Sequence, residues 1–402
     1  MTMTFPLYTL TSSLHDAEAV DSITREFLYG IGLDFDLRGS DFSDYGNGPD
    51  IIYVRTGGTE GIFREIFPRL RHDRPFYLLT SGKSNSLAAS MEILSWLRQQ
   101  GIKGEILHGE ATQIRERLLT VGMVEQARKK LDGARFGVIG RPSDWLIASA
   151  YDPEALQLRL GITLEDIPIQ ELLDEIRSIG PVHAPEDLST VPCAAAPVRA
   201  SLDASYGIYQ ALKHLAARHG LSGLTLRCFD LLKAVHGTGC LALSLLNADG
   251  IVAACEGDVP AMVSMAVAQA LTGCTGFQCN PAEMSAAKNE ILFAHCTLPF
   301  DMARKCVFDT HFESGIGLGI HGEIAEGPVT VFKLSGKLDR HFVCEAKLLQ
   351  NEYGKDLCRT QIRLRFPADS QVVDRYFLKD PIANHHIVIP GHCASLIEEF
   401  LA

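Results

Sequence analysis

Glu256, His295 and the pair His385–His386 each come directly after a short apolar run of the sequence. Such runs are typical of buried strands, and α/β folds place their chemistry where strands end. We therefore expect these acid and imidazole side chains to lie at strand ends. Carboxylate oxygens and imidazole nitrogens, without thiolates, suit a divalent cation such as Mn²⁺. The three segments predict one cation site.

Each of these side chains also has a structural explanation. Glu256 or Asp258 could cap the helix that is expected to begin just after them. A histidine such as His295 is often a hydrogen-bonded core residue. In a strand, His385 and His386 would point to opposite faces, so that one could bind metal while the other supports the site or contacts substrate. The sequence leaves these alternatives open.

Length and composition indicate a protein of several domains. The chain has 402 residues, of which 46% are hydrophobic. This length exceeds what a single hydrophobic core usually supports, so we expect two or three domains. The formal net charge is −12 and no dense run of Lys or Arg occurs, which argues against nucleic acid or a membrane as a partner. No apolar run would span a bilayer and the first residues do not resemble a signal peptide, so we expect a cytoplasmic protein.

The first 192 residues contain no cysteine. All 11 fall between Cys193 and Cys393. An odd number without a secretion signal predicts reduced thiols. Several lie in apolar runs, where we expect them to fill the core.

The pattern of apolar residues divides the chain into three parts. Residues 1–133 and 134–275 alternate strand-like runs with helical segments, and each predicts a Rossmann-like, doubly wound parallel sheet. Residues 276–402 change to a period of two between Gly, Pro and Asp, which predicts a β-rich domain, an antiparallel barrel or sandwich. The second part would carry Glu256, and the third would carry His295 and the His385–His386 pair.

Seven short motifs are spread over nearly the whole chain, in an order and spacing that are fairly specific together. They are Thr56-Gly57-Gly58-Thr59-Glu60, Asn85-Ser86-Leu87-Ala88-Ala89, Gly140-Arg141-Pro142-Ser143-Asp144-Trp145, residues 254–258, Ala294-His295-Cys296-Thr297, residues 311–319 and Asn384-His385-His386. With them the chain resembles the L-fucose/L-arabinose isomerase superfamily, particularly its shorter fucose isomerase-like members. The resemblance implies two Rossmann-like domains and a β-rich third, assembly as homotrimers or hexamers, and a divalent metal, usually manganese, for interconverting aldoses and ketoses.

The resemblance also implies a metal shell of a Glu, a second acid and a His. It places Glu256 as the first ligand and His385 or His386 as the last, with His295 near the metal. At the position of the second acid stands Asn280, which offers a carbonyl oxygen but cannot take a proton. Two nearby acids, Glu283 and Asp258, are substitutes in sequence that do not match the motif.

The resulting hypothesis is a metal-dependent aldose–ketose isomerase that acts on a monosaccharide through a cis-enediol. Glu256 would serve as ligand and base, and His295 as a second catalytic residue. Glu256, Asn280 and His386 would hold Mn²⁺ or Mg²⁺. Asn280 and His385 would contact the sugar.

Basic side chains in predicted loops bear on the kind of sugar. Lys83 and Arg141, with Arg55, could meet the anionic group of a phosphorylated, sulfonated or carboxylated sugar, although they could equally be solvated surface charges. Asn280 also leaves a second hypothesis open: a homologue that binds or senses a sugar without turning it over.

Overall fold

The computed structural model describes residues 3–402, and contacts between Cα atoms divide the chain into two compact units. The first unit ends at Gln126, inside helix α4 (Ala111–Leu131), and the second runs from Ala127 to Ala402. All eleven cysteines are free thiols, as the sequence predicts. None of the helices in residues 3–402 combines the length and the apolar character that a bilayer crossing requires.

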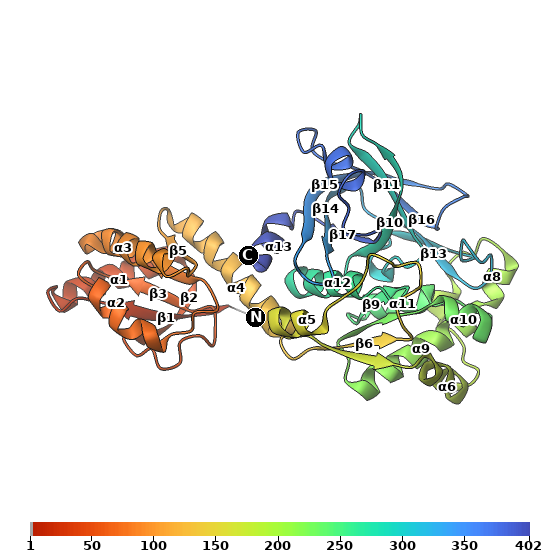
Figure 1. The fold of residues 1–402 in the computed structure, drawn as a ribbon, viewed down its shortest axis with the longest axis horizontal. Helices are drawn as coiled ribbons and strands as arrows, with labels where there is room; N and C mark the ends of the chain where they lie inside the picture. Colours follow the sequence, from red (N-terminus) through yellow and green to blue (C-terminus); the bar gives the residue numbers. More distant parts are fainter. Residues whose placement is uncertain (1–2) are drawn as a thin grey trace. The chain divides into compact units, whose positions relative to one another are not determined.

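The first unit is a five-stranded parallel sheet with helices on both faces (Figure 1). The strand order is β2-β1-β3-β4-β5. The strands are β1 (Thr4–Leu10), β2 (Asp34–Gly39), β3 (Ile51–Val54), β4 (Phe76–Leu79) and β5 (Gly104–Leu107). Their apolar residues share one core with α2 (Glu60–Ile66) and α3 (Ser86–Gln99), and another with α1 (Ala17–Ile31) and α4. Covering both faces in this way buries the central strands β3 and β4, which are apolar along their whole length, whereas the edge strand β2 is mostly exposed.

The second unit begins with a four-stranded parallel sheet in the order β7-β6-β8-β9. The strands are β6 (Arg135–Ile139), β7 (Thr163–Ile167), β8 (Gly223–Leu226) and β9 (Val252–Cys255). Their apolar side chains share a core with α6 (Ile169–Ile179), α9 (Leu202–His219) and α11 (Cys240–Ala248). Helix α12 (Val259–Thr272) also packs against β8 and β9 and is buried along almost its entire length.

A closed antiparallel barrel of six strands completes the second unit. Its order is β10-β11-β16-β15-β14-β17, and β17 closes it by pairing with β10. The strands are β10 (Phe277–Ser285), β11 (Glu290–His295), β14 (Gly327–Leu334), β15 (His341–Glu352), β16 (Thr360–Arg365) and β17 (His386–Pro390). Helix α12 contacts β14 and β17, so it lies between the parallel sheet and the barrel. The α/β prediction with a β-rich C-terminal part is confirmed, and the structure decides for the barrel over the sandwich.

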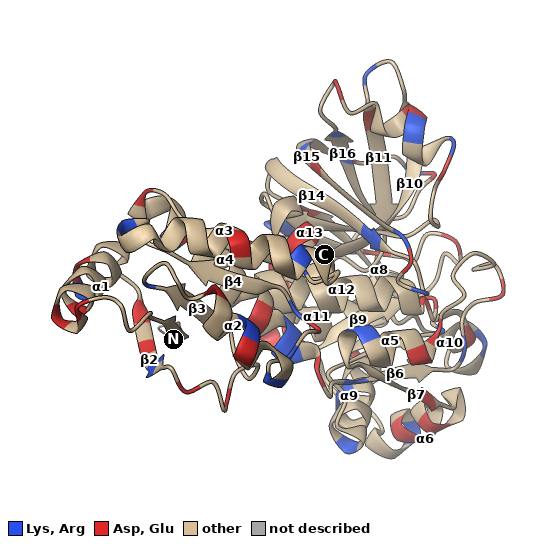
Figure 2. Cartoon of the chain, turned by 60° about the vertical axis from the view of Figure 1, so that its left-hand side comes forward, with Lys and Arg blue, Asp and Glu red and all other residues tan. Residues whose placement is uncertain are grey.

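Shorter elements connect these layers. They are α5 (Pro153–Leu160), α7 (Glu186–Ser189), α8 (Ala196–Ala200), α10 (Phe229–Ala234), α13 (Ala394–Leu401), the strand pair β12 (Lys305–Asp309) and β13 (Gly319–Glu323), the short 3-10 helices η1 (Phe67–Arg69), η2 (Lys83–Asn85) and η3 (Phe300–Met302), and the π-helix η4 (Val373–Phe377). Figure 2 shows basic and acidic residues interspersed along the helices of both units.

Two of the three predicted strand-end positions are confirmed. Glu256 follows β9 directly, and His295 is the last residue of β11. The expectation that His385 and His386 follow a strand is wrong, because β17 begins at His386. The apolar run before them is a loop, opened by a proline that cannot donate to a sheet, and the amide of Ile382 donates to the Tyr376 hydroxyl instead.

Candidate metal centre

Glu256 occupies a strained turn between β9 and α12. Its φ of 66° lies in the left-handed region, which is costly for a side chain other than glycine. The amide of Ser143 donates to the Glu256 carbonyl at 2.9 Å and helps to hold this conformation. Asp258 then caps α12, since its carboxylate accepts from the Ala261 amide at 2.8 Å. The capping explanation is therefore correct for Asp258, and it leaves the Glu256 side chain free for another role.

The residue after Glu256 has to be glycine. Gly257 has a φ of 71°, and a Cβ atom there would lie 2.5 Å from the carbonyl oxygen of Arg141. Real Cβ atoms do not approach a backbone oxygen so closely. The loop after β6 thus packs directly on the turn that carries Glu256.

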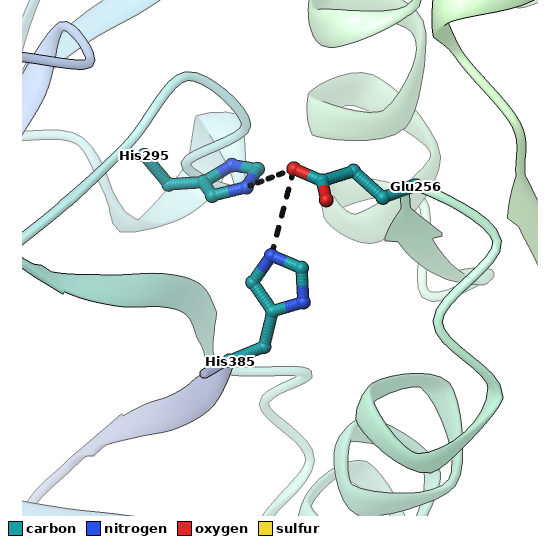
Figure 3. A group of neighbouring side chains, drawn as sticks. All are labelled: Glu256, His295 and His385. Carbon is teal, nitrogen blue, oxygen red and sulfur yellow. Dashed lines mark ion pairs between the residues drawn. The ribbon is translucent and has the colours of Figure 1, made fainter. Parts of the chain in front are cut away.

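Glu256, His295 and His385 point toward one another, with ligand atoms that all lie within 4.8 Å (Figure 3). The Oε1 atom of Glu256 is 3.8 Å from Nε2 of His295 and 3.6 Å from Nε2 of His385. Both imidazoles are buried, and the Glu256 side chain is 13% exposed. One carboxylate and two imidazoles converging in this way form a donor set for a divalent cation.

The opposite nitrogen of His385 is held by a carboxylate. Its Nδ1 donates to Oδ2 of Asp258 at 2.8 Å, which leaves Nε2 facing Glu256 without a hydrogen-bond partner. Histidines that bind metals are typically oriented by a carboxylate in this way. Lys333, also fully buried, places its Nζ 3.8 Å from the same Asp258 oxygen. The ammonium balances the buried negative charge of Asp258.

His295 is oriented by a neighbour in sequence. Its Nδ1 lies 2.9 Å from the Thr297 hydroxyl, and its Nε2 is turned toward Glu256. Two independent contacts, one from Asp258 and one from Thr297, therefore aim the Nε2 atoms of both imidazoles at the same carboxylate oxygen.

The electrostatics of the group follow from burial and from these contacts. Burial would raise the pKa of Glu256, but the two imidazoles hold it well below its ordinary range. Burial would lower the pKa of His385, but its contacts with Asp258 and Glu256 raise it to about 9. The pKa of His295 is lowered, chiefly by burial. A cation bound here would displace the proton that His385 otherwise holds between the two carboxylates.

His386 lies apart from this group. Strand alternation turns it into an aromatic cluster with Phe293, Phe342, Tyr376 and Phe377. Its Nδ1 donates to the Asn384 carbonyl at 2.9 Å and its Nε2 accepts from the Tyr376 hydroxyl at 3.0 Å. Burial lowers its pKa to about 3. The structure thus brings His385 to Glu256 and gives both nitrogens of His386 other partners.

Asn280 and the two acids near it in sequence have hydrogen-bond partners of their own. Asn280 lies in β10, and its side-chain Oδ1 accepts a hydrogen bond at 3.0 Å from the side-chain amide Nδ2 of Asn384. Glu283 is exposed and accepts from Arg363. Asp258 is occupied by its helix cap and by His385. Among the described residues 3–402, the converging group consists of Glu256, His295 and His385, so Glu256 is its one carboxylate.

The basic residues expected to meet an anionic sugar occupy different places. Arg141 lies in the loop after β6, exposed and 3.5 Å from Asp144. Lys83 is exposed and begins η2 in the first unit. Arg55, also in the first unit, donates to Thr24 and pairs with Asp21.

Sequence reasoning missed three residues that support the site. Trp145 donates its indole N–H to Oε2 of Glu256 at 2.6 Å, although only its place in the 140–145 motif singled it out. Lys333 carries a usable signal, because it shares a strand phase with the apolar Val329 and Val331, where a lysine needs a buried counter-charge. Thr297 gives no signal beyond its closeness to His295.

Comparison with known proteins points in one direction. No family model matches the chain. It is 27% identical over 287 residues to a sulfoquinovose isomerase of Clostridium sp. (strain MSTE9), a match that covers 65% of this chain and 61% of that protein. Sulfoquinovose isomerases of Priestia aryabhattai and Priestia megaterium are each 27% identical over 234 residues, 55% of this chain and 52% of theirs. The matches thus span less than two thirds of these relatives' lengths, and the relatives' names agree with the sugar-isomerase part of the resemblance.

Proposed function

We propose that the chain is a metal-dependent aldose–ketose isomerase that acts on a monosaccharide with an anionic group. The observation that carries the proposal is the convergence of Glu256, His295 and His385, in which the buried Nε2 of His385 has no hydrogen-bond partner. A buried polar atom without a partner is costly, and a cation among the three ligand atoms would relieve that cost. The relatives named sulfoquinovose isomerase support both the reaction and the anionic character of the sugar.

The donor set fits a divalent metal ion. Glu256, His295 and His385 would hold it, with Asp258 and Thr297 orienting the two imidazoles. We propose Mn²⁺ rather than Mg²⁺, because two nitrogen ligands suit a transition metal better than a cation that prefers oxygen. When bound, such an ion supplies electrostatic stabilisation of the charge that develops on neighbouring sugar oxygens.

The proton transfer of the reaction is assigned to the side chains of the protein. Isomerisation through a cis-enediol requires removal of the proton beside the carbonyl and its return to the adjacent carbon. Glu256 is the one carboxylate in the group, which makes it the group's candidate for accepting that proton. Asn280 lies at the position expected for a second acid and cannot take a proton. Glu256 is therefore proposed as the base, through the lone pair of Oε2 that the Trp145 N–H does not use.

Two measurements test this function. The first is metal analysis of the purified protein, followed by Mn²⁺-dependent exchange of the substrate C2 proton with solvent, measured by NMR on sulfonated, phosphorylated and carboxylated hexoses. We expect exchange and ketose formation, and a loss greater than about tenfold in Glu256→Gln, as removal of a general base usually causes. Turnover of Glu256→Gln within tenfold of wild type contradicts the role of Glu256. A sugar that binds without any product under added Mn²⁺ would favour the binding or sensing homologue.

The resemblance also leads us to propose a homotrimer or hexamer. Sedimentation velocity of the purified protein measures this directly, and a monomer across the micromolar range contradicts it. The result does not depend on the metal measurements.

A further inference from the structure

The two carboxylate oxygens of Glu256 have different partners. Oε1 faces the Nε2 atoms of His295 and His385, whereas Oε2 accepts the indole N–H of Trp145 at 2.6 Å. A hydrogen bond to an ionised acceptor is stronger than one between neutral groups. The carboxylate is therefore fixed in one orientation, with a single oxygen turned toward the imidazoles.

Several contacts hold Trp145 where it can do this. Its ring packs edge-on against Phe229, with centroids 4.8 Å apart and planes at 78°. In the same loop, Ser143 donates its amide to the Glu256 carbonyl, and the Arg141 carbonyl packs on Gly257. The loop after β6 thus contacts both the backbone of the turn at Glu256 and the Glu256 side chain.

The exposure of Trp145 sets it apart from a core residue. Its side chain is 50% exposed, while the carboxylate that it contacts is largely buried. Indole N–H groups find partners when they are buried, but a half-exposed indole can be satisfied by solvent. The bond to Oε2 is thus not needed to satisfy Trp145, and its main consequence falls on Glu256.

We infer that Trp145 is a positioning residue that reserves Oε2 of Glu256, so that the carboxylate presents Oε1 alone to a divalent cation. This inference rests on the proposed function. Without the indole N–H, the carboxylate can rotate and offer either oxygen or both. A freely rotating Glu256 carboxylate loses conformational entropy when the ion binds, and this cost weakens the affinity for the ion.

The sequence offers a clean experiment, because the chain has only two tryptophans. Trp145→Phe keeps a smaller aromatic ring to pack on Phe229 and removes the N–H donor. Trp96→Phe is the matched control, since Trp96 lies in the first unit and packs on Phe63 and Phe67. Isothermal titration of each metal-free protein with Mn²⁺ measures affinity, and far-ultraviolet circular dichroism checks the fold. We expect Trp145→Phe to bind Mn²⁺ about tenfold more weakly, which corresponds to the lower end of the range for a hydrogen bond to a charged group. We expect Trp96→Phe to bind Mn²⁺ as the wild type does.

A second readout follows the contact itself in the metal-free protein. With ¹⁵N-labelled tryptophan, the indole resonance that survives in Trp96→Phe belongs to Trp145. We expect it to shift when Glu256 is replaced by Gln, because the charged acceptor is lost. An unmoved resonance would overturn the inference.

The outcomes separate the two proposals. If the wild-type protein binds no divalent ion, the proposed function fails and this inference falls with it. If the wild type binds Mn²⁺ and Trp145→Phe binds it within twofold of wild type, only the positioning role is overturned. Weaker binding in Trp145→Phe together with the shifted indole resonance supports the inference.

Discussion

Lys333 and Asp258 form an ion pair in which both side chains are fully buried, with Nζ 3.8 Å from Oδ2. The same carboxylate caps α12 and accepts from His385, so one buried charge connects the barrel, the helix and the proposed metal ligands. Burial would raise the pKa of Asp258, but Lys333 and His385 lower it to about 2. The carboxylate is therefore ionised throughout the neutral range.

Replacing Lys333 by Met should destabilise the protein by about 3 kcal/mol, because it leaves an uncompensated buried charge. Urea unfolding followed by circular dichroism measures the change. Lys305→Met is the control, since Lys305 is exposed and its pair with Glu323 should contribute at most about 1 kcal/mol. A loss below about 1 kcal/mol in Lys333→Met would show that Asp258 does not depend on this lysine.

Asp258→Asn should weaken metal binding by about 10- to 100-fold, the range found when a carboxylate that orients a ligand histidine is removed. The amide keeps an oxygen that can cap α12, but Lys333 loses its counter-charge, so circular dichroism first checks that the variant is folded. Titration of the metal-free variant with Mn²⁺ tests this. Asp16→Asn, at the cap of α1 in the first unit, provides a matched control that should bind as wild type does. Equal affinities in the two variants contradict the role of Asp258.

Gly257→Ala should be more damaging than an alanine at an equally left-handed glycine. Gly257 has a φ of 71° and its added Cβ would meet the Arg141 carbonyl, whereas Gly273 has a φ of 79° and nothing within 4 Å. We expect about 1 kcal/mol of destabilisation at Gly273, from backbone strain alone, and at least twice that at Gly257. Thermal unfolding of both variants gives the comparison. Similar losses of stability in the two variants would mean that the loop after β6 can move to accommodate the added Cβ atom.

The stability contributed by His219 should depend on pH. Its Nδ1 lies 2.6 Å from Glu165 and its Nε2 lies 2.7 Å from Glu171, contacts that raise its pKa, most strongly through Glu171. A pKa raised in the folded state adds stability that is fully present below the ordinary value of 6.5 and is lost as the pH rises through the raised value. The difference in Tm between wild type and His219→Gln should thus be larger at pH 5.5 than at pH 9.5. For the exposed His183, the same substitution should have a small effect at both pH values.

Local pattern was enough to predict the fold class and the strand-end positions of Glu256 and His295. The runs at β3, β4, β6, β8 and β9 are apolar and end in turns, and they place Glu256 correctly after β9. The strand β7, Thr163–Ile167, was missed because its sequence, TLEDI, carries two acids. Strands at a sheet edge can be polar because one side faces solvent, and β7 is an edge strand.

The choice between His385 and His386 depends on long-range register, which no local pattern contains. Pairing of Cys279 with His386 across β10 and β17 starts the strand at His386 and turns that side chain into the aromatic cluster. His385 is left just before the strand, against the cap of α12. Partners that are 127 residues apart, such as Asp258 and His385, come together only through the closed barrel.

The burial of α12 between the parallel sheet and the barrel has a consequence for the order of maturation. Glu256 leaves the sheet at the start of this helix, while His295 ends the barrel strand β11 and His385 stands just before β17, both of which are made later in synthesis. The three ligand atoms therefore meet only after the last strand has closed on the first. An ion held by these three ligands would therefore bind only after the barrel has closed, and it would stabilise the closed state alone.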